Sequence, residues 1–338
     1  MDNHAWRIAI PFASAAVGGS FFSGFEWLRF FAYYGIWGML GILLTGWALA
    51  WVCSRVLCLC SRNRLSSLLD LYRSWFGEAM APGLSILTHF LLVGYLGSMT
   101  GNLFTALSKG AAAWGLLFLT FFLASLLLLR GSRALFQAMG SVLAAGFLLF
   151  VLLLLPQRHV PIPSLVYQIH GFWILQSLSY LSLHFLLCLT MTIPLAGGIS
   201  SEKSIRRGVC LGSLCFLVLA LLGQAVLLAY WHDVNASAAP FQVILAQLWS
   251  WGSWLYALLS AICPAVFAAA LANALAWPVS LRHDLYSRPL ALVMLALILL
   301  FAMLAAVLPW SLTLFASAAT YGGALLLIRA MQQRLKPS

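Results

Sequence analysis

The chain has 338 residues, of which 63% are hydrophobic and only 7% charged, and its formal net charge is +11. Soluble domains carry about a quarter charged residues, so this composition excludes a water-soluble protein and leaves no room for a separate soluble catalytic domain. The excess of Lys and Arg is expected to mark the cytoplasmic side of a membrane rather than a nucleic-acid partner.

Apolar runs of about 20 residues, long enough to cross the hydrocarbon core of a bilayer, fill nearly the whole chain. Breaks at charged residues, Gly and Pro divide these runs into ten predicted transmembrane helices. They cover residues 6–30, 34–60, 83–107, 111–129, 132–155, 173–198, 208–231, 250–278, 290–308 and 311–330. Two amphipathic stretches, 66–76 and 241–249, are predicted between spans, the first along the membrane interface. The fold class is an all-α integral membrane protein.

The basic residues predict the orientation. With ten spans, both termini share one side, and fifteen of the 18 Lys and Arg residues would lie there. The other three are Arg29, Lys109 and Arg158. Because basic residues gather on the cytoplasmic side, we expect a multi-pass protein of the bacterial inner membrane with cytoplasmic N- and C-termini.

The loop 156–172 divides the ten spans into two groups of five, residues 1–155 and 172–331. An odd number of spans per group makes the second group enter the membrane from the opposite side. This is the arithmetic of the inverted repeats that build many secondary transporters. The alternative is that ten spans divide evenly by accident.

The first span carries Gly18, Gly19, Ser20, Ser23 and Gly24 where a plain membrane anchor would have leucine. These residues lower helix propensity. Glu26 follows them, and an ionisable group at membrane depth costs about 3 kcal/mol on insertion scales, so it normally faces a cavity or a partner. The pattern predicts an interrupted helix whose freed backbone groups point into a central site. The alternative is a small-residue packing face, with Glu26 near the outer surface and paired with Arg29.

The run 18–26, followed by Phe30-Phe31 and by 34–41, resembles the start of the YkvI-like bacterial membrane proteins. Ser20 and Phe25 depart from the family pattern, and the specific match covers only about the first 45 residues. Proteins of this kind resemble the LeuT-fold transporters of amino acids, polyamines and organocations. The resemblance implies a five-plus-five inverted repeat with helices 1 and 6 broken at mid-membrane. It implies no particular substrate.

A counterpart in the sixth span would lie near residues 179–184, because serines can satisfy backbone groups where a helix opens. His184 can carry a proton near neutral pH. The alternative is that the serines bond to their own helix and His184 to a neighbouring one; His89 in the third span is a weaker candidate of the same kind. The polar residues of this stretch are Ser177, Ser179, Tyr180, Ser182 and His184.

The resemblance also implies a place for a coupling sodium ion, between helix 1 carbonyls and helix 8 hydroxyls. Helix 8 offers Ser260 near a Cys263-Pro264 pair, with Ser253 as a substitute. Hard cations need several oxygen ligands, so these residues make a weak sodium site. Protons are therefore favoured as the coupling ion, with Glu26 and His184 as carriers. No resident metal or cofactor is expected.

The leading hypothesis is a secondary active transporter that moves a small organic solute, an amino acid or an amine, by alternating access. The partners would be this solute, the lipid bilayer and protons. The alternatives are a transporter-like receptor or assembly protein that binds a ligand without moving it, and a sodium-coupled symporter. An enzyme is not expected, because the chain has no metal-spaced cluster, serine elbow or nucleotide loop. The predicted substrate-binding residues are Gly18, Gly19, Ser20, Phe21, Phe22, Ser23, Glu26, Ser179, Tyr180 and His184.

Overall fold

The computed structural model describes residues 3–107, 110–156, 171–199 and 201–332, which form helices and turns without a strand. Nine helices of this part are long and apolar enough to cross a membrane. With the interrupted helix that precedes them, they account for the ten predicted spans. The nine are α3 (Ile36–Arg62), α5 (Ala81–Leu107), α6 (Ala111–Arg130), α7 (Ser132–Leu154), α8 (Phe172–Ala196), α9 (Glu202–Ala229), α12 (Gly252–His283), α13 (Ser287–Val307) and α14 (Ser311–Gln332).

Large apolar side chains are exposed on several of these helices. Trp47 on α3 is 64% exposed, Phe122 on α6 is 60% exposed and Leu300 on α13 is 59% exposed. In water such surfaces would drive aggregation, whereas in lipid they meet acyl chains. The outer surface therefore fits a protein that crosses the bilayer many times.

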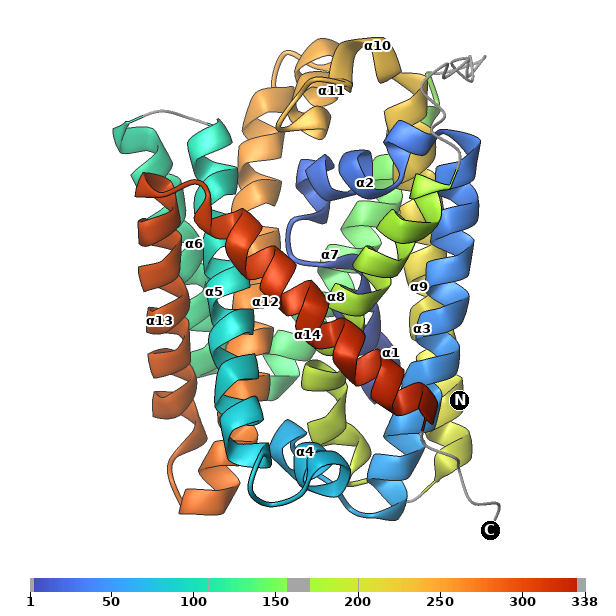
Figure 1. Cartoon of the computed structure of the whole chain (residues 1–338). Coiled ribbons are helices and arrows are strands. Elements are labelled where there is room, and N and C mark those ends of the chain that lie inside the picture. The colour runs from blue at the N-terminus through green and yellow to red at the C-terminus, as the bar shows by residue number, and fades with distance from the viewer. Residues whose placement is uncertain (1–2, 108–109, 157–170, 200, 333–338) are drawn as a thin grey trace.

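Short helices mark the two ends of the bundle. α4 (Leu68–Phe76) lies at one end, and α10 (Trp231–Val234) and α11 (Pro240–Leu248) lie at the opposite end (Figure 1). These ends are called the α4 end and the α11 end below. The two short helical stretches predicted at 66–76 and 241–249 are both confirmed.

An ion pair ties α4 to α12. Arg282 donates from Nη2 to Asp70 Oδ1 over 2.8 Å, and the Ser67 hydroxyl donates to Asp70 Oδ2 over 2.6 Å. Partial burial alone would raise the pKa of Asp70, but the hydrogen bonds from Ser67 and Ser66 and the charge of Arg282 outweigh it. The pKa of Asp70 is therefore held below its ordinary value, and the carboxylate stays charged at neutral pH.

The first membrane helix is interrupted. α1 (Asn3–Val17) ends at mid-bundle, a single 3-10 turn (Phe21–Ser23) follows, and α2 (Phe25–Phe30) continues toward the α11 end. Gly18 has φ +86° and Gly24 has φ +74°, a left-handed conformation that other residues adopt only with strain. The predicted interruption at 18–24 is confirmed, and these two glycines bound it.

The predicted break in the sixth span is wrong. α8 is a continuous helix from Phe172 to Ala196, through the whole stretch 179–184. The reason is that its serines bond within their own helix: Ser177 Oγ donates to the Trp173 carbonyl and Ser182 Oγ to the Leu178 carbonyl, both over 2.7 Å. Such bonds to the preceding turn leave the helical ladder closed. Helix 1 is thus the broken helix and helix 6 is not.

Glycines let two pairs of helices approach closely. A Cβ on Gly208 of α9 would lie 2.6 Å from the Ala5 carbonyl oxygen of α1. A Cβ on Gly97 of α5 would lie 2.6 Å from the Ile298 carbonyl oxygen of α13. Only a residue without a side chain permits such backbone contact.

The helix pairings recur between the two groups of five spans. α1 packs on α9 and α8 packs on α3, while α5 packs on α13 and α12 packs on α6. In an inverted repeat α1 would correspond to α8 and α3 to α9, so the pair α8–α3 is the counterpart of the pair α1–α9. In the same way α5 would correspond to α12 and α6 to α13, so the pair α12–α6 is the counterpart of α5–α13. The division into related halves, 1–155 and 172–331, stays a prediction that these pairings favour.

Candidate functional site

The backbone groups freed at the interruption receive a hydrogen bond from α8. The hydroxyl of Tyr180 donates to the Ala16 carbonyl over 2.8 Å and lies 3.5 Å from the Val17 carbonyl. Tyr180 is fully buried, and its ring stacks on that of His184 with centroids 3.7 Å apart. A side chain of the continuous helix therefore holds the end of α1.

The carboxylate of Glu26 is only half satisfied. Oε1 accepts a hydrogen bond from the Tyr95 hydroxyl over 2.6 Å, whereas Oε2 is buried and has no hydrogen-bond partner in the described structure. The Ser20 hydroxyl lies beside the carboxylate and is itself buried without a completed hydrogen bond. Glu26 forms no ion pair with Arg29, so the simple pairing considered from the sequence does not occur.

His184 presents an unpaired ring nitrogen to the same place. Nδ1 lies 3.1 Å from the Tyr180 carbonyl oxygen, which can only accept, so the neutral ring carries its proton on Nδ1 and a lone pair on Nε2. Nε2 is buried and has no partner among the described residues.

Gly18 lies between these two groups. A Cβ on Gly18 would be 3.2 Å from His184 Nε2 and 3.5 Å from Glu26 Oε2. Two hydrogen-bond acceptors thus flank one point at the interruption, because Gly18 has no side chain to fill it. A proton, a water molecule or an ammonium group supplies the donors that this arrangement lacks.

The residues that meet around this point are called the Glu26 cluster: Gly18, Ser20, Glu26, Tyr95, Tyr180 and His184. One cavity reaches the Glu26 cluster from the α11 end. It has a volume of about 250 Å³ and is called the Glu26 cavity. Ala238, from the turn between α10 and α11, lies at its edge, while α2, α5 and α14 contribute its walls. Its polar lining residues are Ser20, Ser23, Glu26, Arg29, Tyr95, Asn102 and Thr320.

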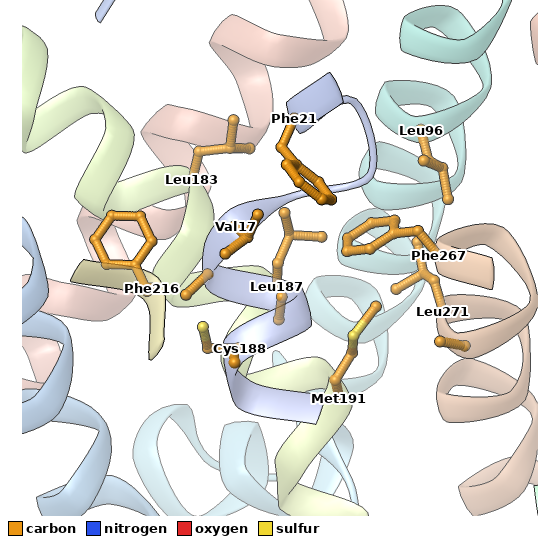
Figure 2. Packing of buried hydrophobic residues seen from close by; sticks show 14 of the residues in the cluster. Val17, Phe21, Leu96, Leu183, Leu187, Cys188, Met191, Phe216, Phe267 and Leu271 are labelled. Carbon is orange, nitrogen blue, oxygen red and sulfur yellow. The ribbon is translucent and has the colours of Figure 1, made fainter. Parts of the chain in front are cut away.

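A second cavity, of about 400 Å³, lies between α1, α7, α8 and α12 and is called the Arg7 cavity. It shares Pro194 and Ala274 with a smaller hollow that reaches α4, which places it toward the α4 end. A space of only about 20 Å³, lined by Gly18, Phe21 and Phe267, lies between it and the interruption. Figure 2 shows the side chains of Phe21 and Phe267 close to one another beside the interrupted segment. The two large cavities therefore approach the interrupted helix from opposite ends without meeting.

The structure brings together only part of the predicted site. Gly18, Ser20, Glu26, Tyr180 and His184 converge as described, and Ser23 lines the Glu26 cavity while its Oγ accepts from the Phe25 amide over 3.2 Å. Gly19 packs against the Phe267 ring.

Other predicted residues lie elsewhere. Phe22 joins a buried aromatic cluster with Phe21 and Phe150. Ser179 lies on another face of α8 and donates to the Leu175 carbonyl over 2.9 Å.

The remaining candidates lie on α5 and α12, which are the third and the eighth membrane helices. Ser253 is exposed at the start of α12. Ser260 is buried one turn from Cys263 and its hydroxyl has no completed hydrogen bond in the described structure. His89 contacts the Ser85 carbonyl of its own helix over 2.7 Å and lines a hollow near α4, apart from the Glu26 cluster.

Tyr95 is the site residue that the sequence analysis missed. It follows Gly94 in the middle of the apolar helix α5, and a buried tyrosine hydroxyl normally needs a polar partner. That signal was present in the sequence, but it named no partner, since Glu26 lies 69 positions away.

Comparison with known proteins agrees with the resemblance seen in the first helix. The chain is 24% identical over 249 residues to "Uncharacterized membrane protein YkvI" of Bacillus subtilis (strain 168), which covers 71% of each protein. No protein-family model matches the chain.

Two solved structures share the fold. The substrate-bound outward-open state of a Na⁺-coupled sialic acid symporter matches with a TM-score of 0.69 and 11% identity, over 97% of this chain and 79% of that one. MhsT in complex with L-phenylalanine matches with a TM-score of 0.60 and 15% identity, over 95% and 87%. The chain therefore has the LeuT fold that the sequence predicted, in a form whose sixth membrane helix is uninterrupted.

Proposed function

We propose that this protein is a secondary active transporter that moves a small organic solute by alternating access. The observation that carries the proposal is the approach of two cavities, from opposite ends, to one interrupted helix that bears unpaired buried polar atoms. Buried polar atoms without partners are costly, so such a cluster is maintained where a ligand completes it. The fold shared with a sialic acid symporter supports the same function.

The Glu26 cluster favours a solute with an amine, such as an amino acid. Glu26 Oε2 and His184 Nε2 both accept hydrogen bonds, and an ammonium group donates up to three. Phe25 and Phe30 line the same cavity and supply apolar walls with aromatic faces that attract a cation.

Protons are the coupling ion that we favour. In the absence of a solute, a proton taken up by Glu26 Oε2 or by His184 Nε2 would turn that acceptor into a donor. The other charged or titratable groups around Glu26 are Arg29 on its own helix, Tyr95 on α5 and Tyr180 on α8. In proton symport the proton would be carried by one of these two side chains while the solute amine binds beside it.

A sodium ion between α1 and α12 has little support. The α12 residues that line the narrow space there, Cys263, Val266, Phe267 and Ala270, offer no side-chain oxygen, and Ser14 of α1 is the one lining residue with a hydroxyl. The carbonyls of Ala16 and Val17 already face the Tyr180 hydroxyl. Sodium needs several oxygens at once, and this place supplies few.

Solute counterflow in proteoliposomes tests the function. Candidate amines and amino acids are first selected by thermal stabilisation of the purified protein, and labelled solute is then exchanged against an unlabelled internal pool. A transporter accumulates the label transiently. A protein that binds the same solute with no exchange would be a receptor, and the proposal would fail.

Glu26→Gln tests the coupling. Gln keeps the size of the side chain but cannot carry the proton, so we expect pH-gradient-driven uptake to fall about tenfold or more, while counterflow persists. Glu78→Gln is the matched control, because Glu78 lies in the turn after α4, exposed and paired with Arg73. Undiminished pH-driven uptake in Glu26→Gln, or uptake that strictly requires sodium, would contradict proton coupling.

We further propose that the α4 end faces the cytoplasm of a bacterial inner membrane. Arg62, Arg64 and Arg73 lie at this end, in keeping with the excess of basic residues on cytoplasmic surfaces. Ser237→Cys should react with an impermeant thiol reagent on spheroplasts, whereas Arg64→Cys should react only after permeabilisation. The opposite pattern of labelling would reverse the orientation.

A further inference from the structure

The Arg7 cavity is the larger of the two main cavities, and in the proposed transport cycle it is the approach to the interruption from the α4 end. Its polar residues are Arg7 on α1, Ser132 and Arg133 at the start of α7, and Asn273 on α12. The rest of its lining is apolar, including Met139, Met191 and Trp277. It is thus an apolar hollow with a few polar groups, the usual make-up of a small-molecule site.

The charges of this cavity have one sign. Two guanidinium groups, from Arg7 and Arg133, come from different helices, and the described lining residues include no Asp or Glu. A third guanidinium lies close by, since Arg288 Nη2 would be 3.5 Å from a Cβ on Gly131, the residue before Ser132. Two exposed cations on one lining, with no carboxylate among its described residues, attract an anion, and the apolar walls strengthen that attraction.

The backbone of α7 adds to the same field. Its N-cap residue is Gly131, which has no side chain to cap the helix, and the first amide with a helical partner is that of Leu135. The positive end of a 23-residue helix therefore adjoins the two arginines. Ser132 and Arg133 belong both to this helix start and to the cavity lining.

We propose that the Arg7 cavity binds an anion, a carboxylate or phosphate group held by Arg7 and Arg133 with its apolar portion toward Met139 and Met191. This site shares no lining residue with the Glu26 cavity, and its binding is measured without any transport assay. The group could belong to a small soluble anion or to the headgroup of an anionic lipid, and these two sources share the same chemistry. The depth of the cavity favours the soluble anion, because Met139 also lines the narrow space at Gly18.

Binding is tested on the full-length protein in neutral detergent. Inorganic phosphate and benzoate are titrated at constant ionic strength, with sodium chloride as the reference salt, and thermal stabilisation is recorded. A parallel set of nanodiscs compares phosphatidylglycerol with phosphatidylcholine. Saturable stabilisation by phosphate or benzoate identifies a soluble anion, and stabilisation by phosphatidylglycerol alone identifies a lipid headgroup.

Arg7→Gln combined with Arg133→Gln should weaken the apparent affinity for the stabilising anion at least about tenfold, since both charged hydrogen-bond donors are lost. Arg64→Gln is the matched control, an exposed arginine at the same end that does not line the cavity. The unliganded melting temperature of the double variant shows whether it folds. The inference is overturned if neither anion nor phosphatidylglycerol stabilises the wild type more than the double variant.

Discussion

Two helices that meet at the centre of the molecule carry similar polar residues but differ in backbone structure. α1 and its continuation carry Ser20, Ser23 and Glu26, and α8 carries Ser177, Ser182 and His184, yet only the first is interrupted. The difference is glycine. Gly18 adopts φ +86°, whereas the serines of α8 keep helical geometry and bond to the preceding turn. Serine in an apolar span therefore predicts an internal hydrogen bond, and glycine beside it predicts an opening.

The two helices contribute different groups to the site. The interrupted helix supplies freed carbonyls and the Glu26 carboxylate, and the continuous helix supplies fixed partners, Tyr180 and His184. A rigid helix holds its side chains more precisely than a loop. The continuous helix α8 therefore holds the open end of α1 in place through the side chain of Tyr180.

Replacing Gly18 should have the largest effect. Gly18→Leu forces a side chain into a left-handed backbone position, which costs about 1–2 kcal/mol, and drives it between His184 Nε2 and Glu26 Oε2. We expect counterflow to fall about tenfold or more and the melting temperature to drop. Gly115→Ala, in open space on α6, should leave both unchanged or raise stability slightly. Normal counterflow in Gly18→Leu would remove Gly18 from the site.

Removing the Tyr180 hydroxyl should have an intermediate effect. Tyr180→Phe leaves the Ala16 carbonyl buried without its donor, so we expect a loss of about 1–3 kcal/mol of unfolding free energy in detergent. Tyr256→Phe is the control, because that buried hydroxyl approaches only Ser260 and completes no hydrogen bond in the described structure. Equal losses in the two variants would mean that Tyr180 does not hold the end of α1.

Removing a serine of α8 should have the smallest effect. Ser179→Ala deletes a half-exposed hydroxyl whose bond stays within one helix, so the unfolding free energy should change by less than about 0.5 kcal/mol. Counterflow should also be unchanged, because Ser179 lines neither cavity. A large loss of uptake would return Ser179 to the site where the sequence analysis had placed it.

The sequence predicted the elements of the fold well, because membrane spans depend on local composition. All ten spans and both short amphipathic helices were foreseen, and the interruption was placed at the correct glycines. The break in α8 was predicted wrongly. A serine that bonds within its own helix and a serine that satisfies an opened backbone look the same in a single apolar run.

The site itself was predicted in part, for a different reason. Glu26 and His184 stood out as ionisable residues in apolar spans, but their approach across Gly18 depends on how the interrupted segment and α2 pack against α8. Tyr95 became visible only through its bond to Glu26 from a distant helix. Contacts of this range follow from packing of whole helices, which residue patterns within one helix do not encode.

The glycine-mediated helix pairs described above have a mechanical consequence. Backbone contact at Gly208 joins α1 to α9, and backbone contact at Gly97 joins α5 to α13, so neither pair can slide or bend internally without a clash. Neither large cavity is lined by both helices of one of these pairs. We therefore expect a change of access to displace these two stiff pairs relative to one another, with residues 18–24 as the hinge, while the hydrogen bond from Tyr180 to Ala16 keeps α1 attached to α8.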